Sequence, residues 1–145
     1  MIQSGNMNET ITVETHVDAP IETVWNAFND VAAIPKWNAP SNDWHTPRAK
    51  NNLEVGGTFL YRMEAKDGST GFDFTGTYTD VTPHEHLAYV MSDGRKAKVT
   101  FAEEGEGTRV VTVFDPETEN PHEVQRAGWQ AILDNFKKYV ETPLE

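Results

Sequence analysis

Apolar and polar residues alternate along much of the chain, with the period of two that is typical of half-buried β-strands. The alternation begins at residues 11–17 and is densest between residues 58 and 114. Short turns that contain Asp-Gly or other glycines separate its segments, which indicates hairpins. Hairpins join antiparallel neighbours, so the pattern predicts one curved antiparallel sheet of about six or seven strands. The strands predicted after the first are 44–49, 58–65, 71–81, 86–91, 96–103 and 108–114.

Three other segments have the spacing of amphipathic helices. Two short ones, 20–29 and 31–37, lie near the N-terminus, and a long one spans residues 121–141. We expect Asn120 to be the N-cap of the long helix, with Glu123 as the acidic partner in a capping box. Two short helices, a sheet and one long C-terminal helix together predict the α+β fold class.

The long predicted helix has one polar face and one apolar arc. Gln125 and Asn135 lie on or beside this arc, where their amides would either orient a ligand or bind neighbouring backbone groups. An antiparallel sheet needs its apolar face covered, and this helix is the element able to cover it. The apolar arc consists of Val124, Gly128, Ile132, Phe136 and Tyr139, with Trp129 and Val140 on its flanks.

Composition narrows the classes of function. The 145 residues fit a single domain, predicted over 9–143, after a lead segment 1–8 that is disordered or not native to the protein. No cysteine is present, which excludes disulfides and thiolate metal sites. The net charge of −11 argues against nucleic-acid binding, which needs basic patches. The polar start and the lack of a long apolar run predict a cytoplasmic protein without membrane insertion.

Several short motifs, in a fixed order, resemble one known family over about residues 11–140. It is the family named for the activator of heat-shock protein 90 ATPase, in its C-terminal-domain form, within the START-like or SRPBCC helix-grip superfamily. The resemblance implies a helix-grip fold with a hydrophobic cavity under the long helix, and it implies no single activity. The motifs are Asp18-Ala19-Pro20 with Val24-Trp25, Trp37, Val55-Gly56-Gly57-Thr58-Phe59, Gly76-Thr77-Tyr78, Gly107-Thr108 and Gly128-Trp129.

Large aromatic side chains are the main candidates for lining this cavity. Rings with a few polar tips are typical of a small-molecule site, although any single ring also suits a packed core. The sequence leaves open which face of strand 71–81 lines the cavity, the face of Phe74 and Tyr78 or that of Asp73 and Thr75. The predicted lining residues are Trp37, Phe59, Tyr61, Met63, Phe74, Tyr78, Gln125, Trp129, Ile132 and Phe136.

No motif assigns a catalytic residue, a metal or a cofactor. Glu64 and Asp73 would be acid–base candidates only if their side of the sheet faced the cavity. His84 and His86 have a spacing that permits chelation, but an exposed turn explains the pair as well.

These observations rank three functions. The function that we rank first is the binding of a small hydrophobic ligand, lipid-like or aromatic. The alternative is an enzyme with cyclase- or hydrolase-like acid–base chemistry in the same cavity. A co-chaperone-like interaction domain ranks last, because the eukaryotic co-chaperones of this family carry an additional N-terminal domain and few residues precede Ile11.

Overall fold

Seven strands form one antiparallel sheet in the order β1-β7-β6-β5-β4-β3-β2. The computed structural model describes residues 9–142, so the predicted lead 1–8 and the last residue of the predicted domain lie outside the described residues. Every strand expected from the alternation is present. The strands are β1 (Ile11–Val17), β2 (Trp44–Asn51), β3 (Thr58–Ala65), β4 (Gly71–Thr82), β5 (His86–Met91), β6 (Lys96–Glu104) and β7 (Gly107–Phe114).

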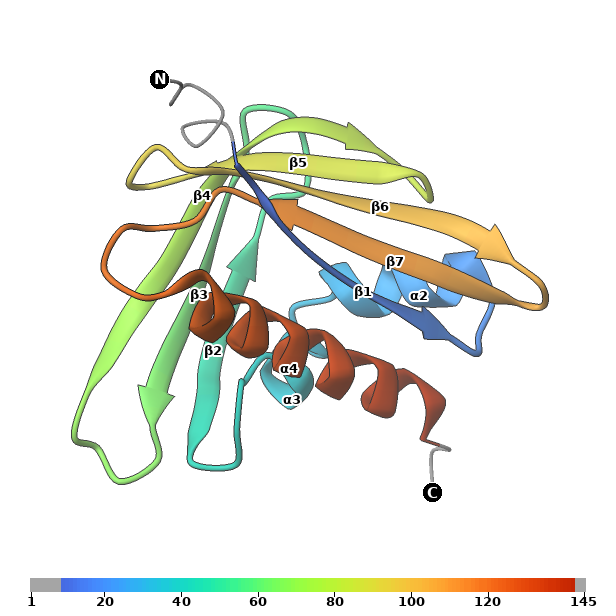
Figure 1. Cartoon of the computed structure of the whole chain (residues 1–145). Helices are drawn as coiled ribbons and strands as arrows, with labels where there is room; N and C mark the ends of the chain where they lie inside the picture. Colours follow the sequence, from blue (N-terminus) through green and yellow to red (C-terminus); the bar gives the residue numbers. More distant parts are fainter. Residues whose placement is uncertain (1–8, 143–145) are drawn as a thin grey trace.

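Three helices complete the fold: α2 (Ile21–Asn29), α3 (Ile34–Trp37) and α4 (His122–Glu141). Figure 1 shows the sheet curving around α4, with α2 and α3 beside it. The predicted α+β class and its helix-grip arrangement are therefore confirmed. None of the helices within residues 9–142 has both the length and the apolar character that crossing a membrane requires.

Aromatic rings join α2, α3 and α4 into one part of the core. Phe28 of α2 stacks on Trp37 of α3, with 5.3 Å between ring centroids. Phe136 of α4 meets both rings edge-on, at 5.2 Å from Phe28 and 4.9 Å from Trp37. Phe101 of β6 contacts Phe28 at 5.4 Å and ties this group to the sheet. These ring contacts fix the position of α4 relative to the sheet.

The beginnings of the helices differ from the prediction. Asn120 is not the N-cap of α4, because Pro121 takes that position with an extended backbone and no side chain caps the helix. The Asn120 amide instead donates to the Glu117 carboxylate at 2.6 Å. The second helix is also shorter than 31–37, because the backbone N–H groups of Ala32 and Ala33 bond to Asp30 in a turn.

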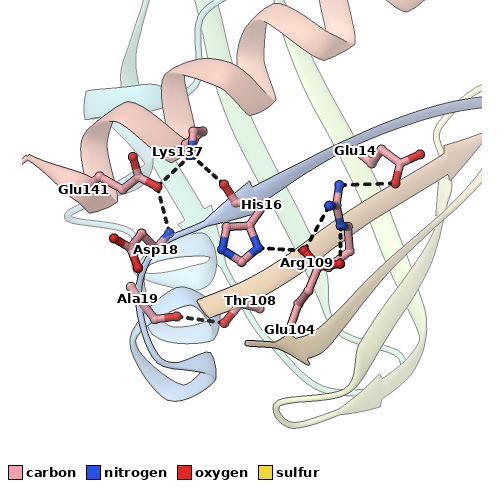
Figure 2. A network of polar contacts seen from close by, with 9 residues as sticks. All are labelled: Glu14, His16, Asp18, Ala19, Glu104, Thr108, Arg109, Lys137 and Glu141. Atoms are coloured by element: carbon pink, nitrogen blue, oxygen red, sulfur yellow. Dashed lines mark hydrogen bonds and ion pairs between the residues drawn. The ribbon is translucent and has the colours of Figure 1, made fainter. Parts of the chain in front are cut away.

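The free edge of β1 is covered by polar side chains of α4. Gln130 donates to the Glu14 carbonyl at 3.0 Å and accepts from the Glu14 N–H at 3.3 Å, as a neighbouring strand would. About two turns later, the Lys137 ammonium donates to the His16 carbonyl at 2.6 Å (Figure 2). Edge strands with unpaired backbone groups invite pairing with other chains. The helix that covers the sheet therefore also satisfies its edge.

Candidate ligand-binding cavity

The concave face of the sheet and the N-terminal half of α4 enclose a cavity of about 370 Å³. Strands β3, β4 and β5 provide much of its floor, α4 provides its roof, and α3 closes one side. Pockets for small molecules have volumes of about 300–1,000 Å³, so this cavity lies at the lower end of that range. The structure brings together nine of the predicted residues around it: Trp37, Phe59, Tyr61, Met63, Phe74, Tyr78, Gln125, Trp129 and Ile132.

The orientation of β4 answers the question that the sequence left open. Phe74 and Tyr78 line the cavity, whereas Asp73 and Thr75 do not. The bulge between Tyr78 and Asp80 comes only after these residues, so the alternation holds across the part of β4 beneath α4.

Phe136 is the predicted lining residue that the structure places elsewhere. Its side chain is fully buried among the rings of Phe28 and Trp37 and does not reach the cavity. The reason is its place on α4, one turn beyond Ile132 and Leu133, where α2 and α3 fill the space beneath the helix. Phe136 therefore holds the helix in position and leaves the cavity to the preceding turns.

The first turn of α4 faces the cavity differently from the predicted arc. Val124 is 57% exposed at the mouth of the cavity, while Gln125 is only 7% exposed. The Gln125 amide donates to the carbonyls of Glu117 and Asn120 at 3.0 and 2.8 Å, and accepts from the Glu117 N–H at 2.9 Å. Gln125 thus fixes the loop before α4, as the second of its two proposed roles requires.

Asn135 serves the backbone in the same way. Its amide donates to the carbonyl of Ala39 at 2.6 Å, in the loop that follows α3. Gln125 and Asn135 therefore both donate to backbone carbonyls and hold the loops at the edges of the roof.

Aromatic rings form the floor around Phe59. The centroid of its ring lies 5.0 Å from Tyr61, 5.5 Å from Phe74 and 4.9 Å from Tyr89. The ring rests on Gly76, where an added Cβ would come within 2.6 Å of it. Only glycine leaves this space open, so Gly76 gives the floor its depth.

On the roof, Trp129 lies parallel to Phe114 of β7, with centroids 3.8 Å apart and planes 10° apart. Across the cavity, the Trp129 ring meets Phe74 edge-on, with 6.1 Å between the ring centroids. Gly128, the preceding residue, also lines the cavity, and an added Cβ there would meet nothing within 4 Å. The roof is therefore rigid at Trp129 and open at Gly128.

Three phenols provide the polar tips of the lining. Tyr78 donates to the Asn51 amide oxygen at 2.7 Å. The hydroxyl of Tyr89 has no hydrogen-bond partner within residues 9–142, although the residue is only 8% exposed. Burial raises the pKa of Tyr61, Tyr78 and Tyr89, and for Tyr61 the neighbouring Tyr78 adds to this effect. All three phenols therefore stay neutral and offer hydroxyl groups at neutral pH.

These raised pKa values predict that the folded protein forms no tyrosinate in an alkaline titration through pH 10. In a Tyr139→Phe variant, which keeps only the three cavity tyrosines, absorbance at 295 nm should stay flat through pH 10, about where an unfolded chain titrates. The raised folded-state pKa values contribute stability that is present below pH 10 and is lost as the pH rises above it. Tyrosinate should therefore appear together with the loss of the circular-dichroism signal of the fold. Reversible ionisation near pH 10 in a folded protein would contradict the burial of these phenols.

The carboxylates considered for acid–base chemistry lie outside the cavity. Arg62 donates to Glu64 at 2.8 Å and to Asp73 at 3.3 Å on the opposite face of the sheet. The hydrogen bond from Arg62 lowers the pKa of Glu64, the reverse of what a general acid needs. This pair does not support an enzymatic mechanism in the cavity.

The two closely spaced histidines have separate surroundings. His86 Nε2 lies 2.8 Å from the Asp80 carboxylate, while His84, with a φ of +67°, packs edge-on against Trp25. Within the part of the chain that the structure describes, no group of three or more potential metal-ligating side chains is found.

Several residues of the lining were not among those predicted from the sequence. Tyr89 and Leu87 lie on one face of β5, and the alternation of that strand was a usable signal for them. Thr112 of β7 also lines the cavity, on the face that strand alternation would have assigned. Arg95 and Glu117 come from loops, for which no periodic pattern exists. Their placement required the three-dimensional structure.

Comparisons with solved structures give the same fold. An AHSA1-like protein from Aeromonas hydrophila is 53% identical, with a TM-score of 0.86 and coverage of 92% of each chain. A protein from Cytophaga hutchinsonii is 49% identical, with a TM-score of 0.80 over 91% of this chain and 92% of that one. A protein from Chromobacterium violaceum is 26% identical, with a TM-score of 0.80 over 92% of this chain and 98% of that one.

A comparison with curated proteins gives no significant match. The family model described as "Activator of Hsp90 ATPase homolog 1-like protein" matches residues 18–141, most of the chain. This match and the two solved structures with 53% and 49% sequence identity confirm the resemblance found in the motifs. The chain therefore belongs to the family of Activator of Hsp90 ATPase homolog 1-like proteins.

Proposed function

We propose that this protein binds a small, uncharged and mainly apolar molecule in the cavity beneath α4. The observation that carries the proposal is the combination of aromatic walls with an open roof at Gly128. Burying apolar surface provides about 25 cal/mol per Å², so a ligand that fills this space gains most of its affinity from the rings around it. The family to which the chain belongs is built on a fold that suits such a cavity.

The ligand should carry at least one polar atom. Tyr89 lines the cavity, and its hydroxyl forms no hydrogen bond with another of the described residues, so it is available to a bound molecule. A hydroxyl, carbonyl or ether group on the ligand would satisfy it. Because the phenols are neutral, this contact selects for a hydrogen-bonding group and not for a charge.

The mouth of the cavity also favours an uncharged ligand. Arg95 Nε is engaged by the Asp93 carboxylate at 2.8 Å, and Arg95 Nη1 donates to the Asp115 carbonyl at 3.3 Å. The Glu117 carboxylate accepts bonds from Asn120, which lower its pKa. Both charged groups at the rim are thus already hydrogen-bonded within the protein. Two exposed apolar side chains stand beside them, Phe72 at 48% and Val124 at 57% exposure, where an apolar molecule would pass.

An uncharged fluorescent probe tests this proposal. Titration with N-phenyl-1-naphthylamine should give a saturable rise in emission with one probe per chain, and Tyr89→Phe should leave the binding of this weakly polar probe nearly unchanged. The anionic analogue 8-anilino-1-naphthalenesulfonate should bind more weakly, because its sulfonate has no free cation at the rim. Non-saturable emission, or tighter binding of the anion, would overturn the proposal.

A further inference from the structure

A second hollow lies on the other side of α3 from the cavity, with a volume of about 420 Å³. Its lining includes three lysines and a histidine from four different segments: Lys36 of α3, His45 of β2, Lys66 of the β3–β4 turn and Lys138 of α4. No carboxylate is found among the described residues that line it. In a chain with 23 acidic and 12 basic residues, such a concentration of cations is unexpected.

The three ammonium groups of this basic hollow are free to bind. Within residues 9–142, Lys36, Lys66 and Lys138 form no ion pair within 4.0 Å. Lys137, next to Lys138 but on the other side of α4, is paired with Glu141 at 2.7 Å. The hollow therefore keeps its charge, while the neighbouring lysine is used for structure.

Two carboxylates beside lining residues of the hollow have other partners. Ser41 donates to Asp43 at 2.5 Å; this hydrogen bond lowers the pKa of Asp43, and the charge of Lys66 makes a smaller contribution in the same direction. Glu64 is held by Arg62 at 2.8 Å and lies 3.8 Å from His45 Nε2. Neither carboxylate is among the residues that line the hollow, so its charged lining residues within 9–142 are lysines.

Aromatic side chains form part of the remaining wall of the hollow. Trp44 and Tyr139 are half-buried and present ring surface to the hollow. Trp37 separates the hollow from the apolar cavity, and its indole N–H donates to the Ala27 carbonyl at 3.2 Å. Ring faces beside free ammonium groups suit a molecule with a flat organic part and a compact anionic part.

We propose that the basic hollow binds a phosphate monoester, with its phosphate among Lys36, Lys66 and Lys138 and its organic part against Trp44 and Tyr139. Lysine ammoniums are point charges that contact a multiply charged phosphate from several directions. The forked guanidinium of arginine prefers planar carboxylates. No arginine is found among the described residues that line the hollow. A doubly charged phosphate also gains more than a singly charged carboxylate from three lysines that line one hollow.

Two-dimensional NMR titrations with inorganic phosphate and with phenyl phosphate test the proposal, at an ionic strength kept constant with sodium chloride. Saturable shifts should appear in residues 36–45, 66 and 135–142. The triple variant Lys36→Gln, Lys66→Gln, Lys138→Gln should weaken phenyl phosphate binding about tenfold, the combined effect of three exposed ion pairs.

The matched control is Lys50→Gln, Lys96→Gln, Lys98→Gln, which makes the same change of charge at exposed lysines outside the hollow and should leave the affinity unchanged. Equal weakening by both triple variants, or shifts that do not saturate, would overturn the site as a general charge effect. Tighter binding of phenyl phosphate than of inorganic phosphate supports the monoester. Equal affinity for the two anions overturns it in favour of free phosphate.

Discussion

Replacing Phe136 with alanine is expected to lower the free energy of unfolding by about 3–5 kcal/mol. The ring is fully buried and meets Trp37 and Phe28 edge-on, at centroid distances of 4.9 and 5.2 Å. Such aromatic contacts add about 0.5–1.5 kcal/mol beyond the area that they bury. Because Phe136 is the residue of α4 at which both short helices meet the roof, the cavity left by its removal cannot be filled by a small local shift.

Urea-induced unfolding followed by circular dichroism measures this effect. In a domain of this size each kcal/mol lowers the melting temperature by about 2–4 °C, so the change should also be visible by heating. Phe72→Ala is the matched control, because it deletes the same ring from a side chain that is 48% exposed and should cost about 1 kcal/mol or less. Equal losses in the two variants would show that the α2–α3–α4 contact is not a main source of stability.

Gly128→Leu is expected to weaken binding of the uncharged probe by about tenfold or more while the fold remains intact. A Cβ at this position meets no atom within 4 Å, so the added side chain extends into the cavity and takes the place of ligand. Glycine inside a helix costs about 0.5–1 kcal/mol relative to a good helix former, and leucine removes that cost. Stability should therefore stay the same or rise as binding falls, which separates the loss of binding from unfolding.

Ala127→Leu provides the control for this variant. Ala127 is exposed and precedes Gly128 on the same helix, so the substitution adds a leucine of similar helix propensity on the solvent side. Probe titrations and thermal melts of both variants complete the comparison. Undiminished probe binding by Gly128→Leu would place the probe outside the cavity and would remove the main support for the proposed function.

The sequence was sufficient for the order of elements, because period-two and helical patterns depend only on which side of an element is buried. The starts of helices were harder to predict. Asn120 has the side chain of an N-cap, but the extended backbone of Pro121 delays α4 by one residue and Glu117 takes the Asn120 amide. A local preference was overridden here by the loop's own hydrogen bonds.

The cavity lining could be predicted where strand alternation set the direction of a side chain, as for Phe59, Tyr61 and Phe74. The lining could not be predicted where packing between separate elements determines which side chains reach the cavity. Phe136 belongs to the same apolar arc as Ile132, yet α2 and α3 occupy the space beneath it. The basic hollow also has no sequence signature, because its three lysines and His45 come from separate segments.

The polar contacts between α4 and β1 have a consequence for the making of the protein. Glu14 and Gln130 are 116 residues apart in the chain, and the Asp18 N–H and the Glu141 carboxylate that accepts from it are 123 apart (Figure 2). On its other side, β1 pairs only with β7. Nascent β1 therefore has no native partner on either side until β7 and α4 have been synthesised. Such long-range pairing is slow, and an unpaired strand is prone to aggregation in the meantime. β1 thus depends on two elements that are synthesised long after it, and the sheet of this domain is completed only once α4 has been made.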